Sequence, residues 1–97
     1  MSELSIAKAI ISRGIAAGYQ VSIWEGEGYA IRYSRDIAAI MKALQSTDED
    51  VIHFSQHVDE GKGPFRKSLG WVMLVWGNGE DVVADHSYNE VIDRLVG

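Results

Sequence analysis

The chain contains no cysteine, only one proline and no long apolar run. The lack of cysteine excludes disulfides, thiolate zinc sites and cysteine nucleophiles, and is compatible with a reducing compartment. No run approaches the roughly 18 apolar residues that a membrane-spanning helix requires. The N-terminal segment has an early acidic residue and no basic stretch before an apolar core, so it does not resemble a signal peptide. We therefore expect a cytoplasmic protein without a membrane partner.

Basic residues are also scarce. Nine Lys and Arg stand against 14 Asp and Glu, which gives a formal net charge of −5. Because nucleic-acid binding usually rests on a basic patch, we expect no nucleic-acid partner. The chain has 97 residues, of which 46% are hydrophobic and 24% charged. This length and composition are typical of one globular domain that spans residues 1–97.

Three segments have the apolar spacing of helices. Residues 3–17 follow Ser2, a favourable N-cap, and precede Gly18, which can end a helix. A second helix is predicted over residues 35–46, with Ser34 as its N-cap. The C-terminal segment follows Ser87-Tyr88-Asn89-Glu90, which matches the capping box that opens many helices.

The remaining apolar segments have the pattern of strands. Residues 19–24 and 29–33 read as a hairpin, residues 51–57 as a third strand, and residues 69–85 as a second hairpin. Residues 57–67 hold the only proline and are predicted to form an irregular loop. The order α-β-β-α-β-β-β-α predicts an α+β fold, with a mostly antiparallel sheet of about five strands and helices packed on one face.

The turn at Asn78-Gly79 predicts that Trp76 pairs with Asp81, which assigns every residue of this hairpin to a face. Because burying two unpaired aspartates is costly, the face with Asp81 and Asp85 should be the uncovered one, and the face with Trp71 should lie under the helices. The alternative is that a terminal helix or the 57–67 loop covers this side. The residues predicted to form an interaction surface on the uncovered face are Trp24, Arg32, His53, Val72, Leu74, Trp76 and Val83.

No motif in the chain carries specific chemistry. His53, His57 and His86 lack the H-x-x-x-H spacing of helical zinc sites. Asp85-His86-Ser87 does not predict a triad, because neighbours on a strand point to opposite faces. Gly61-Lys62-Gly63 lacks the G-x-x-x-x-G-K-[ST] pattern of a phosphate loop. We therefore name no catalytic, metal-binding or cofactor-binding residue, expect no cofactor, and do not favour an enzyme.

Residues Gly18–Ser87 resemble a family of small uncharacterised proteins found in bacterial genomes and in phages or prophages. The most distinctive pieces are Ser46-Thr47-Asp48-Glu49-Asp50 and Trp76-Gly77-Asn78-Gly79. The resemblance implies a small accessory protein with a connection to phages. It brings no established activity, so no functional residue is carried over.

The leading hypothesis is a non-enzymatic accessory module that self-associates, or docks on a protein partner, through the uncovered sheet face. One alternative is a small-ligand or metal-binding protein, or a minor enzyme, that uses the 57–67 loop and the three histidines. Another is an inhibitor whose acidic pairs imitate the phosphates of a nucleic acid. The sequence does not identify the partner.

Overall fold

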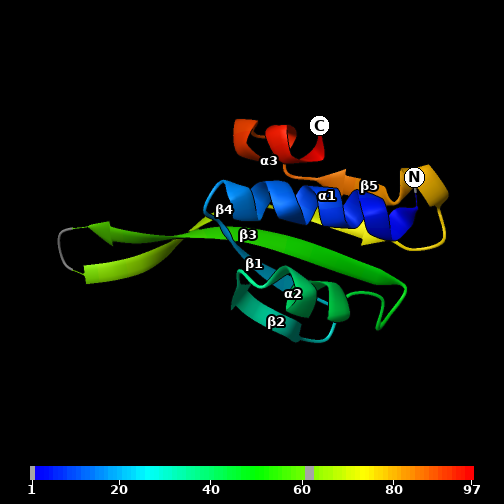
Figure 1. Cartoon of the computed structure of the whole chain (residues 1–97), viewed down its shortest axis with the longest axis horizontal. Coiled ribbons are helices and arrows are strands. Elements are labelled where there is room, and N and C mark those ends of the chain that lie inside the picture. Colours follow the sequence, from blue (N-terminus) through cyan, green and yellow to red (C-terminus); the bar gives the residue numbers. More distant parts are fainter. Residues whose placement is uncertain (1, 61–62) are drawn as a thin grey trace.

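The structure is a computed structural model that describes residues 2–60 and 63–97. Within these residues, three helices, five strands and one short 3-10 helix follow one another (Figure 1). The elements are α1 (Glu3–Ala16), β1 (Gln20–Trp24), β2 (Tyr29–Ser34), α2 (Ile37–Lys42), β3 (Glu49–Glu60), β4 (Gly63–Val75), η1 (Gly79–Asp81), β5 (Val83–His86) and α3 (Glu90–Val96). The predicted α+β order is therefore confirmed. No described helix is long and apolar enough to cross a membrane.

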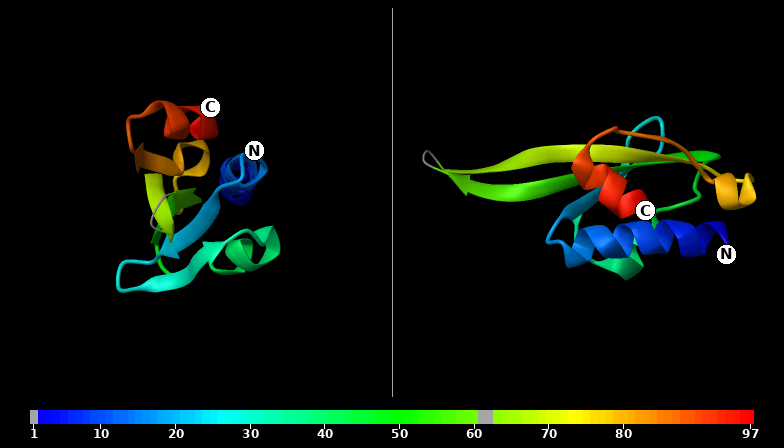
Figure 2. Two further views of the ribbon diagram at one scale, coloured as in Figure 1. Left: turned by 90° about the vertical axis from the view of Figure 1, so that its left-hand side faces the viewer. Right: turned by 90° about the horizontal axis from the view of Figure 1, so that it is seen from above.

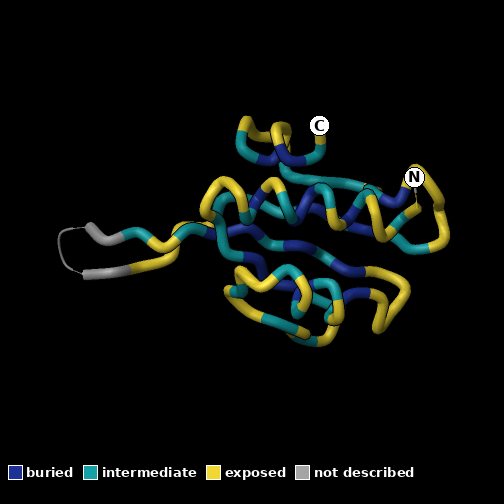
Figure 3. Tube along the Cα trace, in the orientation of Figure 1, coloured by how far each residue is buried: buried dark blue, intermediate teal, exposed yellow. Residues whose placement is uncertain are grey.

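The five strands form one sheet in the order β2-β1-β3-β4-β5, and each neighbouring pair is antiparallel. Figure 2 shows all three helices on the same face of this sheet. The core lies between the helices and the sheet, where the buried stretches of α1, β1, β3 and β4 meet (Figure 3). The largest apolar side chains with no exposed surface are Phe54, Ile11, Ile23, Ile40, Ile52, Leu74 and Ile92.

Helix α1 begins as the sequence predicts and lies very close to the sheet. Ser2 caps it, since the Ser2 hydroxyl accepts a hydrogen bond from the Ser5 backbone N–H at 3.1 Å. Gly14 permits the close approach, because a Cβ atom at this position would lie 2.4 Å from Cε1 of Phe54. The ring of Phe54 therefore occupies the space that any other residue at position 14 would need.

We expect Gly14→Ala to lower the free energy of unfolding by about 1–2 kcal/mol, as overpacking exceeds the gain in helix propensity. Urea denaturation measures this cost. In a Phe54→Leu background the same substitution should cost less, because the smaller side chain leaves room for the added methyl group. A stabilising Gly14→Ala, as expected for an exposed helical glycine, would contradict the close packing of α1.

The second helix is capped by a different residue than the sequence predicts. Ser34 belongs to β2, and the cap of α2 is Asp36, whose carboxylate accepts from the Ala39 backbone N–H at 3.2 Å. The Ser34 hydroxyl instead accepts from the Asp36 backbone N–H at 3.1 Å. Ser34 and Asp36 both favour caps, and Asp36, which lies nearer the apolar stripe, begins the helix.

The predicted capping box at residues 87–90 is also wrong. The cap of α3 is Asn89, whose side-chain oxygen accepts from the Ile92 backbone N–H at 2.9 Å. The Ser87 hydroxyl accepts from the Trp71 backbone N–H at 2.8 Å, so it joins the end of β5 to β4. The Ser87 side chain thus binds the sheet and does not cap the helix, which starts two residues later than a capping box would place it.

The predicted irregular loop at residues 57–67 is replaced by strand. β3 continues to Glu60 and β4 starts at Gly63, with His57 paired to Arg66. Residues 61 and 62 of the predicted loop lie outside the described residues. β1 begins at Gln20, opposite Ser55, so beyond that point β3 and β4 form a two-stranded arm that projects from the sheet (Figure 1). In the arm, β4 pairs only with β3, so its other side is an edge. A proline is tolerated near the start of such an edge strand, so Pro64 does not break β4.

The predicted assignment of faces is wrong for β4 and β5. Val72 and Leu74 have 0% exposure and belong to the core under the helices. Trp76 and Val83 are half-buried and pack against the same core. These four residues were predicted on the uncovered face, and the structure places them with the helices.

A β-bulge explains why the aspartate argument failed. The predicted pairing holds at Leu74, which lies opposite Val83, but the register shifts before Met73, which lies opposite Asp85. Asp85 is therefore on the other face from Leu74. Asp81 lies in η1, outside the strands. Neither aspartate is on the face where unshifted pairing would put it, so neither decides which face is buried.

Candidate functional site

The sheet face away from the helices is called the open face here. Its members follow from the strand register, because residues paired across strands share a face. Ser22, His53 and Trp71 form one row across β1, β3 and β4. The rows on either side contain Trp24, Val51, Met73 and Asp85 on one side, and Gln20, Ser55 and Ser68 on the other.

Three of the seven predicted surface residues meet on the open face. Trp24 and His53 lie in adjacent rows. The Arg32 guanidinium lies over the Tyr29 ring, with its Cζ atom 4.6 Å from the ring centroid. The other four predicted residues, Val72, Leu74, Trp76 and Val83, pack on the helix-covered side.

Aromatic rings link these residues into a cluster. The rings of Trp24 and Tyr29 meet edge to face with centroids 5.0 Å apart, and those of Tyr29 and His53 with centroids 6.0 Å apart. Tyr29 remains 41% exposed, so the cluster presents aromatic surface to the solvent. Aromatic and arginine side chains are the residue types that contribute most to protein interfaces.

The Tyr33 side chain lies on the open face, beside Ser22 and His53, and the sequence did not predict it there. Its φ of 51° is in the left-handed region, which is uncommon for a non-glycine residue. The Tyr33 backbone N–H donates to the Ser22 hydroxyl at 2.9 Å, which holds this conformation. Its ring lies under the Arg66 guanidinium, whose Cζ atom is 3.9 Å from the ring centroid. Strict alternation places Tyr29 and Tyr33 on the helix side, and the register shifts between β1 and β2 overturn that alternation.

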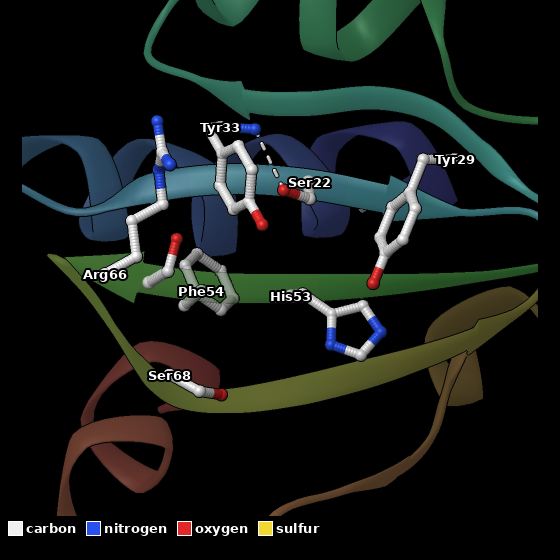
Figure 4. A pocket seen from close by; sticks show the side chains of 8 residues that line it. Ser22, Tyr29, Tyr33, His53, Phe54, Arg66 and Ser68 are labelled. Atoms are coloured by element: carbon white, nitrogen blue, oxygen red, sulfur yellow. Dashed lines mark hydrogen bonds between the residues drawn. The ribbon is translucent and has the colours of Figure 1, made fainter. Parts of the chain in front are cut away.

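A pocket of about 190 Å³ opens beside Tyr33, between β2 and the base of the arm (Figure 4). Ser55 lines it with only 8% exposure, and its hydroxyl has no hydrogen-bond partner among the described residues. Burial lowers the pKa of His53 below its usual value of 6.5, so its imidazole is neutral at pH 7. The residues that line the pocket are Ser22, Tyr29, Tyr33, His53, Phe54, Ser55, Arg66 and Ser68.

None of these eight residues is acidic, although the chain holds 14 Asp and Glu. Three lining residues are serines and two are tyrosines, so the walls are rich in hydroxyl groups. A hydroxyl can donate as well as accept, and the guanidinium of Arg66 only donates. The chemistry of the pocket therefore favours a ligand that accepts hydrogen bonds.

The histidines do not assemble a metal or catalytic centre within the described part of the chain. No group of three or more His, Asp or Glu side chains there is arranged to hold a metal ion. His53 lies in the middle of the open face, whereas His57 is exposed on the arm. His86 Nδ1 lies 2.9 Å from the Ser87 carbonyl oxygen, while the Ser87 hydroxyl is bound to the backbone of Trp71. Asp59 and Glu60 have side chains outside the described residues.

Comparisons with family models, curated proteins and solved structures found no match to this chain. The resemblance to small bacterial and phage proteins therefore remains a prediction. The candidate site rests on its own geometry: an aromatic cluster, two arginines and a hydroxyl-lined pocket on one uncovered sheet face.

Proposed function

We propose that the protein is a non-enzymatic interaction module that self-associates through its open face. Two copies pack with their open faces together, related by a two-fold axis that runs across the strands. The observation that carries this proposal is the distribution of charge along β3 and β4, which is self-complementary only in that arrangement.

The backbone rows that hold Glu49 and Arg66 lie at equal distances on either side of His53. Glu49, paired with Val75, is four residues from His53 in one direction along β3. His57, paired with Arg66, is four residues away in the other direction. At about 3.3 Å per residue, each row is roughly 13 Å from His53. A two-fold axis across the strands at His53 therefore places the row that holds Arg66 in one copy over the row that holds Glu49 in the other, with the two residues on neighbouring strands.

The alternative two-fold axis, along the strands, is electrostatically unfavourable. It would bring Arg66 over Arg66 and Glu49 over Glu49, and like charges facing each other disfavour an interface. Both side chains are exposed, and neither forms a side-chain ion pair with another described residue. Each is thus free to pair with a second copy.

The centre of the proposed interface is aromatic and its ends are charged. His53 and Trp71 lie on the axis, with Trp24, Tyr29 and Met73 in the adjoining row. An apolar centre with a polar rim is the usual anatomy of a protein interface. The two-fold arrangement buries the aromatic cluster and leaves the charged pairs at the rim.

The size of the open face predicts a weak dimer. The open face is five strands wide, at about 4.8 Å per strand, and extends about 26 Å along the strands. These dimensions give at most about 600 Å² per copy. Two copies would bury about 1,200 Å², which is the lower limit of standard interfaces. We therefore expect the dimer to dissociate into monomers on dilution.

Charge exchange at the rim tests the proposal. By sedimentation equilibrium, Arg66→Glu and Glu49→Arg should each raise the dimer dissociation constant by about tenfold, because each creates two like-charge contacts. The double variant Arg66→Glu with Glu49→Arg should restore dimerisation, since both pairs are again opposite in charge. Lys8→Glu, on the exposed side of α1, is the matched control and should leave the constant unchanged.

Two results would remove the proposal. One is a protein that stays monomeric at millimolar concentration. The other is a dimer that neither single variant weakens, or that Lys8→Glu weakens as much as Arg66→Glu does.

A further inference from the structure

We propose that the pocket beside Tyr33 is a binding site for an oxyanion, a phosphate or carboxylate group held by Arg66 and the serine hydroxyls. This inference goes beyond self-association, since it concerns a ligand and rests on the pocket alone. Both proposals use the open face, so the experiment below is designed to separate them.

Ser55 points to a missing hydrogen-bond acceptor. Its side chain is more than nine-tenths buried and lines the pocket, yet its hydroxyl has no partner among the described residues. Buried polar groups in folded proteins are nearly always hydrogen-bonded. The hydroxyl oxygen itself has almost no exposed surface, so it would donate to a bound oxyanion after the side chain rotates about its Cα–Cβ bond. Ser22 adds a second donor, because its oxygen accepts from Tyr33 and its O–H remains available.

Arg66 supplies the positive charge. Its guanidinium is stacked on the ring of Tyr33 and forms no ion pair with any other described residue. Stacking leaves the N–H groups at the edge of the guanidinium free, and these groups match the geometry of a carboxylate or phosphate. Since no acidic residue lines the pocket, an incoming oxyanion would meet no repulsion from its walls.

The volume limits the size of the ligand. The pocket has a volume of about 190 Å³. It is smaller than the sites of drug-sized ligands, which begin near about 300 Å³. The interior of the site therefore fits a single oxyanionic group with the few atoms that carry it.

Two sources could provide such a group: a free small anion, or a carboxylate of a second copy. In the proposed dimer the nearest charged candidate is Glu49, which the two-fold axis brings toward Arg66. The two sources differ in one respect. A free anion leaves the dimer intact, whereas a carboxylate from the second copy competes with any added anion.

The test is a titration of the full chain with inorganic phosphate, followed by amide NMR at a concentration where sedimentation shows only monomer. The amides of Ser22 and Ser55 should shift and saturate, and equal ionic strength of sodium chloride should not reproduce the shifts. Arg66→Gln and Ser55→Ala should each weaken phosphate binding, the former by about tenfold. Lys8→Gln removes one charge on the helix side and should leave the affinity unchanged.

Shifts that do not saturate, or that weaken equally in Arg66→Gln and Lys8→Gln, would overturn the proposal. If the chain binds phosphate but never dimerises, the oxyanion site is supported and self-association is contradicted. If it dimerises but does not bind phosphate, self-association is supported and the oxyanion site is contradicted. Where both hold, phosphate that dissociates the parent dimer assigns the oxyanion to the second copy. Phosphate that binds without dissociating it assigns a free anion.

Discussion

Gly70→Ala is expected to lower the free energy of unfolding by about 3–4 kcal/mol. Gly70 has a φ of 142°, a conformation that L side chains rarely adopt. A Cβ atom there would also lie 2.5 Å from Cγ1 of Ile92 and 2.8 Å from the Ser87 hydroxyl oxygen. Backbone strain and overpacking each cost about 1–3 kcal/mol, and here they act together. Denaturation in urea would measure the loss.

Gly28→Ala is the control for this substitution. Gly28 lies in the turn between β1 and β2, and a Cβ atom there would meet nothing within 4 Å. We expect a change of less than about 0.5 kcal/mol, as for most surface substitutions. If Gly70→Ala were as mild as Gly28→Ala, then α3 would not pack against β4 as the structure describes.

Asp50→Ala is expected to cost about 3 kcal/mol, the second large effect. Asp50 has no exposed surface, and its carboxylate accepts from the Gln45 backbone N–H and from the Trp76 indole N–H, both at 2.8 Å. Gln45 has a φ of 67°, so the first bond also holds an unfavourable backbone conformation. Alanine would leave both donors unpaired, and each partly buried donor without a partner costs about 1–3 kcal/mol.

Asp50→Asn separates the hydrogen bonds from the charge. The amide keeps an acceptor oxygen, so this variant should retain much of the stability that alanine loses. Burial raises the pKa of Asp50 above its usual value near 3.8, and the hydrogen bonds from Gln45 and Trp76 offset this only in part. The folded state therefore binds this proton more tightly than the unfolded state. The stability it contributes is complete below pH 3.8 and is lost as the pH rises through the folded-state pKa.

The free energy of unfolding of Asp50→Asn, relative to the parent, should consequently increase as the pH rises from 3 to 7. Chemical denaturation at several pH values would measure the difference. A difference that is constant with pH, or that changes in the opposite direction, would show that the Asp50 carboxyl is not desolvated.

The element order could be predicted from the sequence because each element has a local cause. Ser2 caps α1, apolar spacing marks the helices, and short polar turns separate the first two strands. The turn after β4 also gave the correct pairing of Leu74 with Val83. These features depend on neighbours in the chain, which is what a sequence displays.

The assignment of faces could not be predicted in the same way. It depended on the expectation that Asp81 and Asp85 would not be buried without partners, and neither shares a strand face with Leu74. It also depended on unshifted pairing, and a bulge moves Asp85 to the open face. Bulges arise from tertiary packing and leave little trace in a single sequence.

Only part of the candidate site could be predicted from the sequence, because the rest depends on shifts in strand register. Trp24, Arg32 and His53 were placed on the uncovered face and do lie there. Tyr33 and Arg66 were not, because one sits at a register shift and the other in a segment predicted as a loop. The Arg66 guanidinium contacts the Tyr33 ring across 33 positions of chain, and this contact follows from the strand order β2-β1-β3-β4.

The central claim is that two copies meet through the open face with their β3 strands in opposite directions. The chain has no cysteine, so single cysteines can be introduced without interference. Glu49→Cys and Arg66→Cys proteins, mixed under mild oxidation, should cross-link to each other far faster than either cross-links to itself. Equal rates of mixed and self cross-linking, or preferential cross-linking of Arg66→Cys with itself, would contradict the proposed dimer.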